Sequence, residues 1–434
     1  MASTYLTRTF GTATNRKIWT WSAWVKRQNL VSDHTNAMFG AYTDGSNRSV
    51  IRFYDHELNF QDSGNSVEIK TSRKFRDMNS WYHIVARVDT TQSTASDRIR
   101  IYVNGEQETA FDQADYPNQN VNMEFQNSVV HYINARHSGT AVDSIADMSY
   151  SHVHFIDGTA YDASAFGSVD NVTGEWKINT APSVTYGNNG FFILKDGNSV
   201  TDQSGNSNNF TVAGGTLTKT EDCPDNVFAT FNPLDHKSTG WNMQNGNTRL
   251  QGTGGATWET RRAISTIGAS TGKYYAELKM TTAGNDSYPF GVGYDVFDLS
   301  YSSSMGSNSN FWGYYQPAGG QIYGGGTGSP LETSLGGGTG DIIGIALDID
   351  NLTLQFYKNG STMGSQITGL PSGKTWFFAS SGYHNTNTFD CNFGNGYFST
   401  SQVSSAGTNA SGNGIFEYDV PTGFTALSTK GLNQ

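Results

Sequence analysis

The sequence predicts an all-β protein built from two tandem antiparallel β-sandwiches. Three observations predict this: many short segments alternate apolar and polar residues, turn-forming residues are abundant, and one hairpin signature occurs twice. Glycine accounts for 50 of the 434 residues and aromatic residues for 13%, whereas charged residues make up only 15%. Aromatic residues favour strands, and Gly and Asn favour tight turns. No segment shows sustained helical periodicity.

Two apolar segments in the N-terminal part show the alternation most clearly. They are residues 18–25, IWTWSAWV, and residues 81–89, WYHIVARVD. Successive side chains of a strand point to opposite faces of its sheet. In the first segment one face carries Trp19, Trp21 and Ala23. In the second segment we expect the core face to be the one that carries Tyr82, Ile84, Ala86 and Val88.

A repeated hairpin signature indicates that the two sandwiches share a fold. Residues 99–105 read IRIYVNG and residues 354–360 read LQFYKNG. Both end in Asn-Gly, which favours a type I′ turn because both central positions need positive φ. Each copy follows a similar strand ending in Asp, IVARVD at 84–89 and IGIALDID at 343–350. Two homologous modules explain this order of strands better than one large fold.

These signals divide the chain into four parts. Residues 1–170 form the first sandwich and residues 240–400 form the second. Between them, residues 171–239 form a turn-rich connector whose strands pack on the sandwiches; GFFILKD and NVFATFNPL are its strand candidates. The tail, residues 401–434, ends in FEYDVPTGFTAL, which we expect to add an edge strand.

Charge and hydropathy exclude several classes of partner. The net charge is −11 and the pI is near 5.2, so the surface does not attract nucleic acid. The sequence contains no run of 18 apolar residues, so we expect no membrane insertion. Residues 1–16 lack the apolar core of a signal peptide, so we expect folding in a cytoplasm. In such a reducing compartment, Cys223 and Cys391 are expected to be free thiols.

Several segments resemble two known modules. WTWSAWVKR at 19–27, WYHIVARVD at 81–89 and IYVNG at 101–105 resemble a laminin-G or concanavalin A-like lectin module. Five later segments resemble, in order, a SPRY module: GKYYAELKM, FGVGY, GDIIGIALD, LQFYKNG and NFGNGYF, between residues 272 and 398. The resemblance implies two concanavalin A-like, jelly-roll sandwiches. SPRY modules act as binding platforms, so it also implies binding rather than catalysis.

The order of further segments resembles that of virion proteins of tailed phages, especially aquatic and cyanobacterial phages. These segments are VHFIDGTAYDASAFG, YGNNGFFIL, DQSGNSNNF, FATFNP and YDVPTGFTAL, between residues 153 and 427. The resemblance implies a virion protein that is assembled in the host bacterial cytoplasm. It implies other virion proteins as partners and a homo-oligomer, a trimer by family analogy. No coiled-coil or collagen-like stalk is visible, which favours a compact component.

Concanavalin-like sandwiches include glycoside hydrolases, so catalysis is a possible function of this fold. These enzymes need two carboxylates roughly 5–10 Å apart in one groove. No strand carries such a pair, and Asp348 and Asp350 precede Asn351 at a predicted turn. We therefore expect no enzyme. His152 and His154 form half of a metal site on one strand face, but no third ligand is evident, and we expect ordinary histidines.

Two loops are candidate ligand sites. Laminin-G modules often bind calcium near the sandwich rim, and a polar loop here offers side-chain oxygens, with a solvated turn as the alternative. Its candidate ligands are Asp202, Ser204, Asn206 and Asn208. The loop at 311–326 is rich in aromatic rings, which stack on sugars. Its candidate ligand-binding residues are Trp312, Tyr314, Tyr315 and Tyr323, unless Trp312 and Tyr314 alternate into the core.

Two functions remain open from these observations. The first is an appendage, a tail fibre or capsid decoration, that attaches to host-surface glycan through lectin-like loops. The second is a purely structural tail or capsid component that contacts other virion proteins through strand edges. A glycan-degrading tail enzyme is a weaker third, because the carboxylate pair is missing. No cofactor other than calcium is expected.

Overall fold

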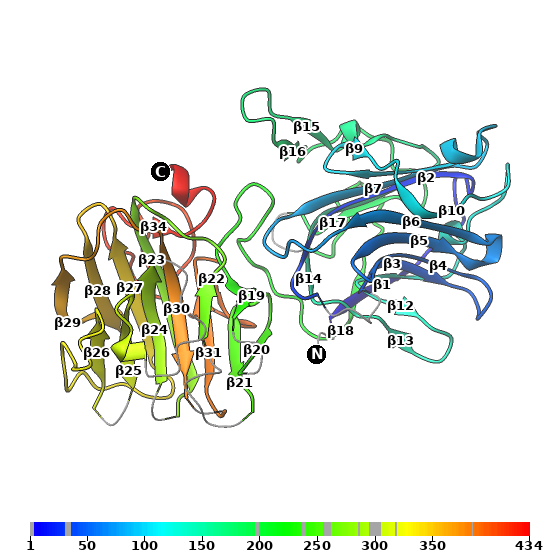
Figure 1. The fold of residues 1–434 in the computed structure, drawn as a ribbon. Coiled ribbons are helices and arrows are strands. Elements are labelled where there is room, and N and C mark those ends of the chain that lie inside the picture. The colour runs from blue at the N-terminus through cyan, green and yellow to red at the C-terminus, as the bar shows by residue number, and fades with distance from the viewer. Residues whose placement is uncertain are drawn as a thin grey trace. The chain divides into compact units, whose positions relative to one another are not determined.

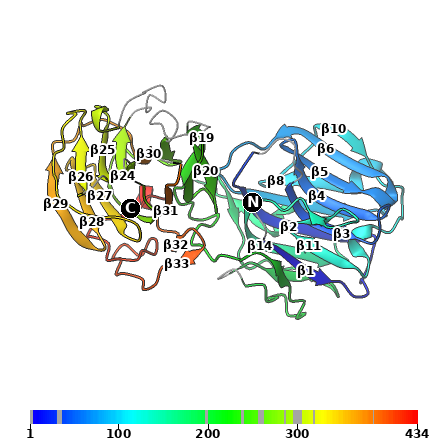
Figure 2. The ribbon, with the colours of Figure 1, turned by 90° about the horizontal axis from the view of Figure 1, so that it is seen from below.

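The structure is a computed structural model that describes residues 4–30, 36–195, 199–236, 240–254, 262–284, 287–294, 305–316, 319–383 and 385–434. The chain divides into unit 1, Met1–Lys219, and unit 2, Thr220–Gln434. Each unit consists of two β-sheets stacked in layers (Figures 1 and 2). The described residues contain strands and short 3₁₀ turns but no α-helix, so the all-β prediction is confirmed.

Unit 1 is a sandwich of an eight-stranded and a six-stranded sheet. The eight-stranded sheet runs, in spatial order, β10 (Phe111–Asp115), β6 (Val67–Lys74), β5 (Glu57–Asp62), β4 (Arg48–Tyr54), β3 (Asn36–Tyr42), β11 (Val130–Ile133), β1 (Tyr5–Thr9) and β18 (Thr211–Gly214). The six-stranded sheet runs β17 (Phe191–Ile193), β14 (Met148–Asp157), β2 (Ile18–Arg27), β7 (Tyr82–Asp89), β8 (Ile99–Val103) and β9 (Glu106–Gln107).

Two small hairpins lie outside these sheets in unit 1. They are β12 (Arg136–His137) with β13 (Val142–Asp143), and β15 (Gly167–Val169) with β16 (Trp176–Ile178). Short 3₁₀ turns interrupt the loops at Ser63–Asn65, Ala95–Asp97, Glu124–Gln126 and Ala163–Ala165.

The core of unit 1 follows from the alternation in β2 and β7. The predicted core face of β7 is buried between the sheets, together with one face of β2 that carries Trp19, Trp21, Ala23 and Val25. The opposite sheet contributes Phe39, Ile51, Phe53, Phe60 and Ile69. Aromatic rings contact one another through this layer, with Trp19 and Phe155 centred 5.6 Å apart. Burial of such large rings accounts for much of the stabilisation of a sandwich.

Unit 2 repeats the two-layer plan. One sheet runs β19 (Phe231–His236), β22 (Arg262–Ser265), β30 (Trp376–Gly382), β24 (Ser287–Tyr294), β25 (Phe311–Gln316) and β26 (Gln321–Gly324). The other runs β20 (Trp241–Gln244), β21 (Arg249–Gly252), β31 (Thr388–Asn392), β23 (Lys273–Thr282), β27 (Ile342–Asp348), β28 (Thr353–Lys358) and β29 (Ser361–Thr368), with β34 (Thr425–Ala426) paired to β23.

Remaining elements of unit 2 are short. β32 (Tyr397–Phe398) pairs with β33 (Ser401–Gln402), and 3₁₀ turns lie at Met305–Ser307 and Gly431–Asn433. The core between its sheets contains Trp376, Phe378, Ile343, Ile345 and Phe356.

Both predicted Asn-Gly turns are present, one in each unit. The φ angles are 48° and 84° at Asn104 and Gly105, and 50° and 79° at Asn359 and Gly360. Each turn joins two strands through two residues, β8 to β9 and β28 to β29. In both units the turn asparagine also binds the start of the strand before the hairpin, which is β7 in unit 1 and β27 in unit 2. Asn104 Oδ1 accepts from His83 N, and Asn359 Oδ1 accepts from Ile342 N, both at 2.8 Å. The sequence repeat is thus a structural repeat.

The boundary between the units falls after Lys219, inside the segment 171–239 that the sequence suggests as a connector. β17 and β18 complete the two sheets of unit 1, whereas β19 begins unit 2. Strand pairing explains this division, because β17 hydrogen-bonds β14 and β18 hydrogen-bonds β1. Within the tail, β34 pairs in parallel with β23 at Tyr274 and Tyr275.

Candidate binding surface

The aromatic loop predicted as a ligand site is strand β25 and the strand that follows it. Alternation along β25 sends Trp312 and Tyr314 into the core of unit 2 and places Phe311 and Tyr315 on the outer face of the sheet. On β26, Ile322 faces the core and Tyr323 faces outward. Two of the four predicted residues, Tyr315 and Tyr323, therefore share an outer surface.

Tyr315 and Tyr323 form a compact group with Tyr288 of β24, here called the tyrosine cluster. The rings of Tyr288 and Tyr315 are stacked with centroids 4.6 Å apart. Tyr323 stands edge-on to both, at 5.5 Å from Tyr315 and 5.9 Å from Tyr288. Tyr288 is buried, whereas Tyr315 and Tyr323 are half-buried and keep part of each ring at the surface. Offset and edge-on pairs are the arrangements that aromatic rings prefer.

Glycines shape the floor beside the tyrosine cluster. A Cβ atom on Gly313 would lie 2.3 Å from Cζ of Phe311, and one on Gly291 would lie 2.5 Å from the same atom. The Phe311 ring therefore lies across two residues that have no side chain, and it supports Tyr288 at 5.6 Å between centroids. Half-buried Phe377 of β30 lies beside this group. The result is an aromatic surface on the outer face of this sheet.

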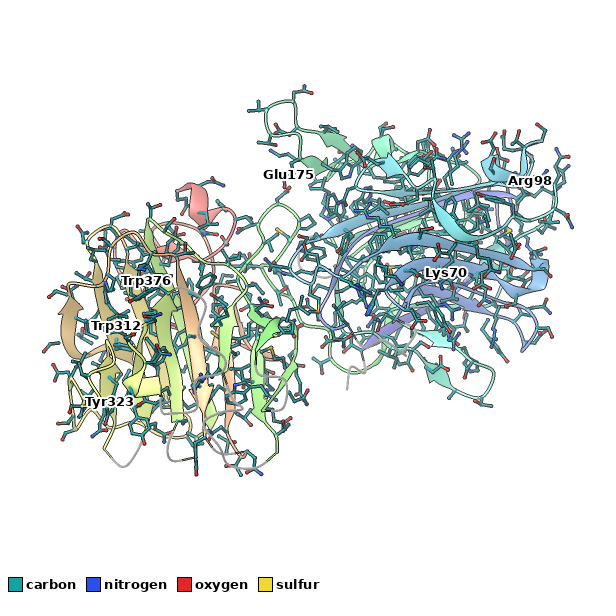
Figure 3. All side chains as sticks on the ribbon, viewed as in Figure 1. Lys70, Arg98, Glu175, Trp312, Tyr323 and Trp376 are labelled. Atoms are coloured by element: carbon teal, nitrogen blue, oxygen red, sulfur yellow. The ribbon has the colours of Figure 1, made fainter. Side chains whose placement is uncertain are left out.

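Trp312 and Tyr314 lie in the core of unit 2 and not on the surface predicted for ligand contact (Figure 3 labels Trp312). The Trp312 ring packs 5.5 Å from Trp376 in the core, and the Tyr314 hydroxyl donates to the Gly336 carbonyl at 2.6 Å. Burial raises the pKa of Tyr314. Both residues thus follow the alternative in which they alternate into the core, since i and i+2 share a face.

Tyr288 and Phe377 were not found from sequence. The pairing of β24 shifts register between Tyr288 and Gly291 on the β30 side and between Ser287 and Phe290 on the β25 side, so a simple period of two fails there. The signal that could have found Tyr288 is Pro289 directly after it, because proline within a strand marks a bulge or an edge.

The predicted calcium loop is closed by hydrogen bonds. Asp202 Oδ1 accepts from Phe192 N and Ser204 N, and Oδ2 accepts from Ser204 Oγ and Asn208 N, at 2.7–2.9 Å. The amide groups of Asn206 and Asn208 donate to the carbonyl of Gly190. The four predicted residues thus come together, but hydrogen-bond donors occupy the carboxylate. Calcium here stays a prediction that the geometry disfavours.

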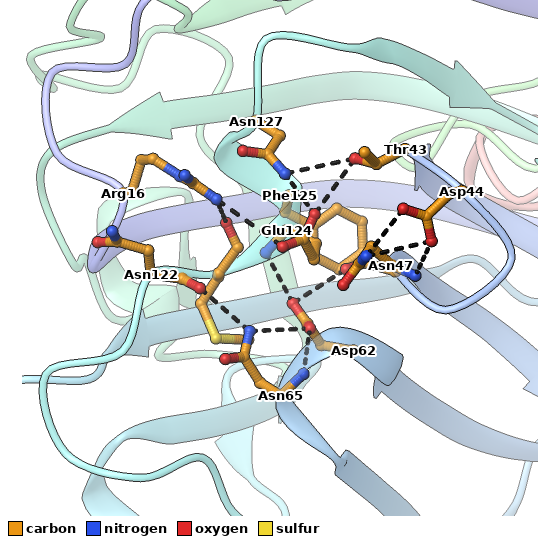
Figure 4. A network of polar contacts seen from close by, with 12 residues as sticks. Arg16, Thr43, Asp44, Asn47, Asp62, Asn65, Asn122, Glu124, Phe125 and Asn127 are labelled. Atoms are coloured by element: carbon orange, nitrogen blue, oxygen red, sulfur yellow. Dashed lines mark hydrogen bonds and ion pairs between the residues drawn. The ribbon is translucent and has the colours of Figure 1, made fainter.

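A second polar network lies at the rim of unit 1 and is centred on Asp62 (Figure 4). Fully buried Asp62 accepts from Ser49 Oγ at 3.0 Å, Asn65 Nδ2 at 3.0 Å and Glu124 N at 2.9 Å. Burial raises the pKa of this carboxyl. The Glu124 carboxylate accepts from Thr43 and Asn127. These contacts join the loop after β5 to the 3₁₀ turn at Glu124–Gln126, which is a structural role.

His154 is buried among aromatic rings of unit 1, and His152 of the same strand is half-buried. His154 stacks on Phe192 at 4.0 Å and its Nδ1 lies 3.0 Å from the Tyr186 hydroxyl. Burial holds the pKa of His154 well below its usual value. His152 adopts φ of 51° where β14 shifts register, and its Nδ1 contacts Ser151 Oγ at 2.8 Å. No group of three His, Cys, Asp or Glu that could hold a metal occurs in the described part of the chain.

His83 lies 2.9 Å from Ser22 Oγ, which is the spacing of a serine–histidine pair. Its other nitrogen, Nδ1, accepts a hydrogen bond from Trp176 Nε1, which can only donate. The ring proton of His83 therefore lies on Nε2 and points at Ser22, so the imidazole cannot take a proton from that hydroxyl. Burial lowers the pKa of His83 to about 3.

The acidic and thiol groups flagged in the sequence have structural contacts. Asp348 accepts from Asn351 N at 2.9 Å and pairs with Lys273, and Asp350 accepts from Gly272 N. Cys391 is buried and donates to the Glu277 carbonyl, and both cysteines are free.

Among the described residues, no helix is both long and apolar enough to span a membrane.

A buried glutamate on the outer face of β23 holds the C-terminal segment. Glu277 is fully buried and accepts from Glu417 N at 2.8 Å, Tyr418 N at 2.9 Å and Tyr275 Oη at 3.2 Å. Phe416 packs on Tyr275 at 5.1 Å. Burial raises the pKa of Glu277 to about 7, although the two backbone donors oppose the shift. This contact covers the face that would otherwise be solvent-exposed.

Comparison with known proteins assigns a module to each unit. A profile described as the concanavalin A-like lectin/glucanases superfamily matches residues 2–127, and a SPRY domain profile matches residues 273–396. Ran-binding protein 9 of Danio rerio is 33% identical over 110 residues, which are 25% of this chain and 18% of that protein. Ran-binding protein 9 of Homo sapiens has the same identity, over 15% of its length. The match thus spans less than a fifth of these relatives.

Among solved structures, the TRIM65 PSpry domain is 16% identical, with a TM-score of 0.31 over 38% of this chain and 88% of that chain.

The chain carries a concanavalin A-like module followed by a SPRY module, as predicted. The prediction of a phage virion appendage located in the virion is wrong. The named relatives are Ran-binding proteins of Danio rerio and Homo sapiens, which are eukaryotic proteins and not components of a virion. The misleading signal was the order of short Gly- and Asn-rich segments, which turn chemistry also produces.

Proposed function

We propose that this chain, a concanavalin A-like module followed by a SPRY module, is a non-catalytic protein-binding protein. Its SPRY unit holds an extended peptide segment of a partner on the tyrosine cluster. The carrying observation is the tyrosine cluster itself: Tyr315 and Tyr323 keep part of their rings at the surface, on the outer face of a packed sheet. Aromatic residues fixed in this way are the usual anchors of protein interfaces.

The neighbourhood of the tyrosine cluster supports a peptide as the ligand. β26 is the last strand of its sheet. Beyond it, Glu332 forms an isolated antiparallel bridge with Ile322 of β26, and the residue before it, Leu331, is 44% exposed. Leu331 N donates to the Ile322 carbonyl at 2.7 Å. An exposed leucine beside half-buried tyrosines offers apolar contacts to a partner's side chains.

The absence of catalysis is part of the proposal and rests on the chemistry of the polar groups. The Nε2–H tautomer of His83 cannot activate Ser22. The carboxylate of Asp348 accepts a hydrogen bond within its turn, and that of Asp350 accepts one from Gly272 N. A hydrolase needs a free acid and base within reach of one substrate.

A peptide-display selection tests the proposal. The full chain is used to select from a random library of about 12-residue peptides, and selected peptides are synthesised and titrated by calorimetry. We expect Tyr315→Ser and Tyr323→Ser to weaken binding by at least about tenfold, because each removes a central aromatic anchor. Tyr54→Ser is the control, since Tyr54 is 39% exposed and belongs to unit 1.

Two outcomes would contradict the proposal. One is a selection that yields no peptide with measurable affinity. The other is peptides whose affinity is the same for the Tyr315 and Tyr323 variants as for the wild type. Thermal unfolding of each variant establishes that a loss of binding does not reflect a loss of folding.

A further inference from the structure

Three arginines meet on the outer face of the eight-stranded sheet of unit 1. Arg48 and Arg52 lie on β4, where Ile51 and Phe53 point into the core and the alternating positions point outward. Arg136 starts the β12–β13 hairpin, which folds over the same sheet. Three cationic side chains from two chain segments are thus directed to one region.

Contacts between the hairpin and β3 place Arg136 beside β4. A Cβ on Gly40 of β3 would lie 3.0 Å from the Ala135 carbonyl and 3.3 Å from Cα and Cβ of Arg136. Gly40 pairs with Val50, the residue midway between Arg48 and Arg52 on β4. Arg48 Nη1 reaches the carbonyl of Ser138 in the hairpin at 3.4 Å. Arg136 therefore begins beside the stretch of β4 from which the other two arginines project.

The acids and polar groups around this cluster are already engaged. Arg52 is only 6% exposed, and its Nε donates to neutral Asn59 at 2.7 Å while its guanidinium lies 4.8 Å from the Tyr54 ring. Asp143 takes Nε of Arg136 at 2.9 Å. Glu68 accepts from Asn59 Nδ2 at 3.2 Å. Burial and the charges of Arg136 and Arg48 lower the pKa of Arg52 to about 10.

Lys70 and Lys74 lie on β6, which β5 separates from β4, and both pair with Glu57 of β5, at 2.5 and 2.7 Å (Figure 3 labels Lys70). The carboxylates of Asp55 and Asp112 also act on Lys70. The excess of positive charge therefore lies at the three arginines, beside Glu68 and Asp143, in a chain whose net charge is −11. Like charges held together at a surface raise the affinity for a compact anion.

We propose that Arg48, Arg52 and Arg136 form a binding site for a tetrahedral oxyanion, a phosphate or sulfate group. Guanidinium groups match such anions because their N–H donors lie in a planar fork. Arg48 Nε is buried and has no hydrogen-bond partner among the described residues, so the cluster has a donor to spare. The site lies in the concanavalin A-like unit and is separate from the proposed peptide surface.

Calorimetry and thermal unfolding of the full chain test the site. Sodium phosphate and sodium sulfate are titrated against sodium chloride at matched ionic strength. We expect saturable binding of phosphate or sulfate and a rise in Tm with either, and no such effect of chloride. Arg48→Gln and Arg136→Gln should each weaken the binding at least about tenfold, because each removes one charged fork. Arg76→Gln, which removes an exposed charge from the loop after β6, is the control.

A second readout separates binding from folding. Without the anion, Arg48→Gln should leave Tm at low salt equal to or above that of the wild type, because it relieves like-charge repulsion. Titration of O-phosphoserine alongside inorganic phosphate distinguishes an ester group from a free ion as the better ligand. Equal phosphate affinity in the wild type and both site variants, or no saturable binding at all, would overturn the assignment.

Discussion

The indole Nε1–H of Trp176 donates a hydrogen bond of 3.0 Å to Nδ1 of His83, and this contact ties the β15–β16 hairpin to the outer face of β7. The indole also fills the space over two glycines, since a Cβ on Gly105 would lie 2.3 Å from Cε3 and one on Gly167 would lie 2.6 Å from Cζ2. Gly105 of the Asn-Gly turn is therefore required twice, by its φ of 84° and by the ring above it.

The first prediction concerns the protonation of His83. Because Trp176 donates to Nδ1, His83 should be the neutral Nε2–H tautomer and should stay neutral as pH falls to about 4.5. Nitrogen chemical shifts of the imidazole measure this directly. Trp176→Phe leaves the buried Nδ1 of His83 without a donor. We therefore expect the free energy of unfolding to fall by about 1–3 kcal/mol and the pKa of His83 to rise.

Trp24→Phe is the control for this prediction. Trp24 stacks on the same imidazole at 5.0 Å, but its Nε1 has no hydrogen-bond partner among the described residues, so the tautomer should not change. A wild-type His83 that titrates near pH 6.5 would contradict the assignment.

The second prediction concerns Glu277 and the C-terminal segment. Its pKa is about 7 in the folded chain and near 4.5 when unfolded, so the folded state holds the proton more tightly. Its contribution to stability is present below pH 4.5 and is lost as pH rises to 7, by on the order of 3 kcal/mol. Urea unfolding and amide-exchange protection of Glu417 and Tyr418, at pH 5 and pH 8, measure this.

Glu277→Gln should remove that part of the pH dependence, since the amide does not ionise. Exposed Glu221 supplies the matched variant, Glu221→Gln, which should keep the wild-type profile. A Glu277→Gln profile that runs parallel to the wild type from pH 4.5 to 7 would be inconsistent with a buried carboxyl of raised pKa.

The third prediction compares two glycines of unit 1 with similar backbone conformation. Gly187 has φ of 69° and a Cβ there would lie 1.9 Å from the Asp157 carbonyl oxygen, so the backbone would have to move. Gly174 has φ of 74° and nothing within 4 Å. We expect Gly187→Ala to lower the free energy of unfolding by more than about 3 kcal/mol and Gly174→Ala to lower it by about 1 kcal/mol. Urea unfolding measures both changes. Equal costs would show that φ alone, rather than contact, decides both.

The fourth prediction concerns calcium at the Asp202 loop. Because four donors satisfy the carboxylate, we expect that a chelator and added calcium both leave Tm unchanged. Asp202→Asn should cost about 1–3 kcal/mol, because an amide N–H would face donors. A rise in Tm of several degrees on adding calcium, lost in Asp202→Asn, would instead support the calcium site.

The tyrosine cluster illustrates where prediction from sequence succeeds and where it stops. Alternation along β25 separates Tyr315 from Trp312 and Tyr314, and this follows from the period of two along any strand. Tyr323 joins the face of Tyr315 only through the pairing of β26 with β25. Which face is the core depends on the second sheet, whose Phe356 and Ile343 come from a different part of the chain. Tyr288 joins from β24, and its place follows from a register shift that no local pattern specifies.

The sequence by itself determined the β-class, the two modules and the two Asn-Gly turns, because strand alternation and positive-φ turns are local properties of a few consecutive residues. Only the tertiary structure decided that Asn104 and Asn359 bind the preceding strands, that Trp176 fixes the proton of His83, and that Arg136 reaches the arginines of β4. These contacts join segments up to about 90 residues apart. Strand pairing and packing bring such segments together, and the local pattern of either segment does not encode its partner.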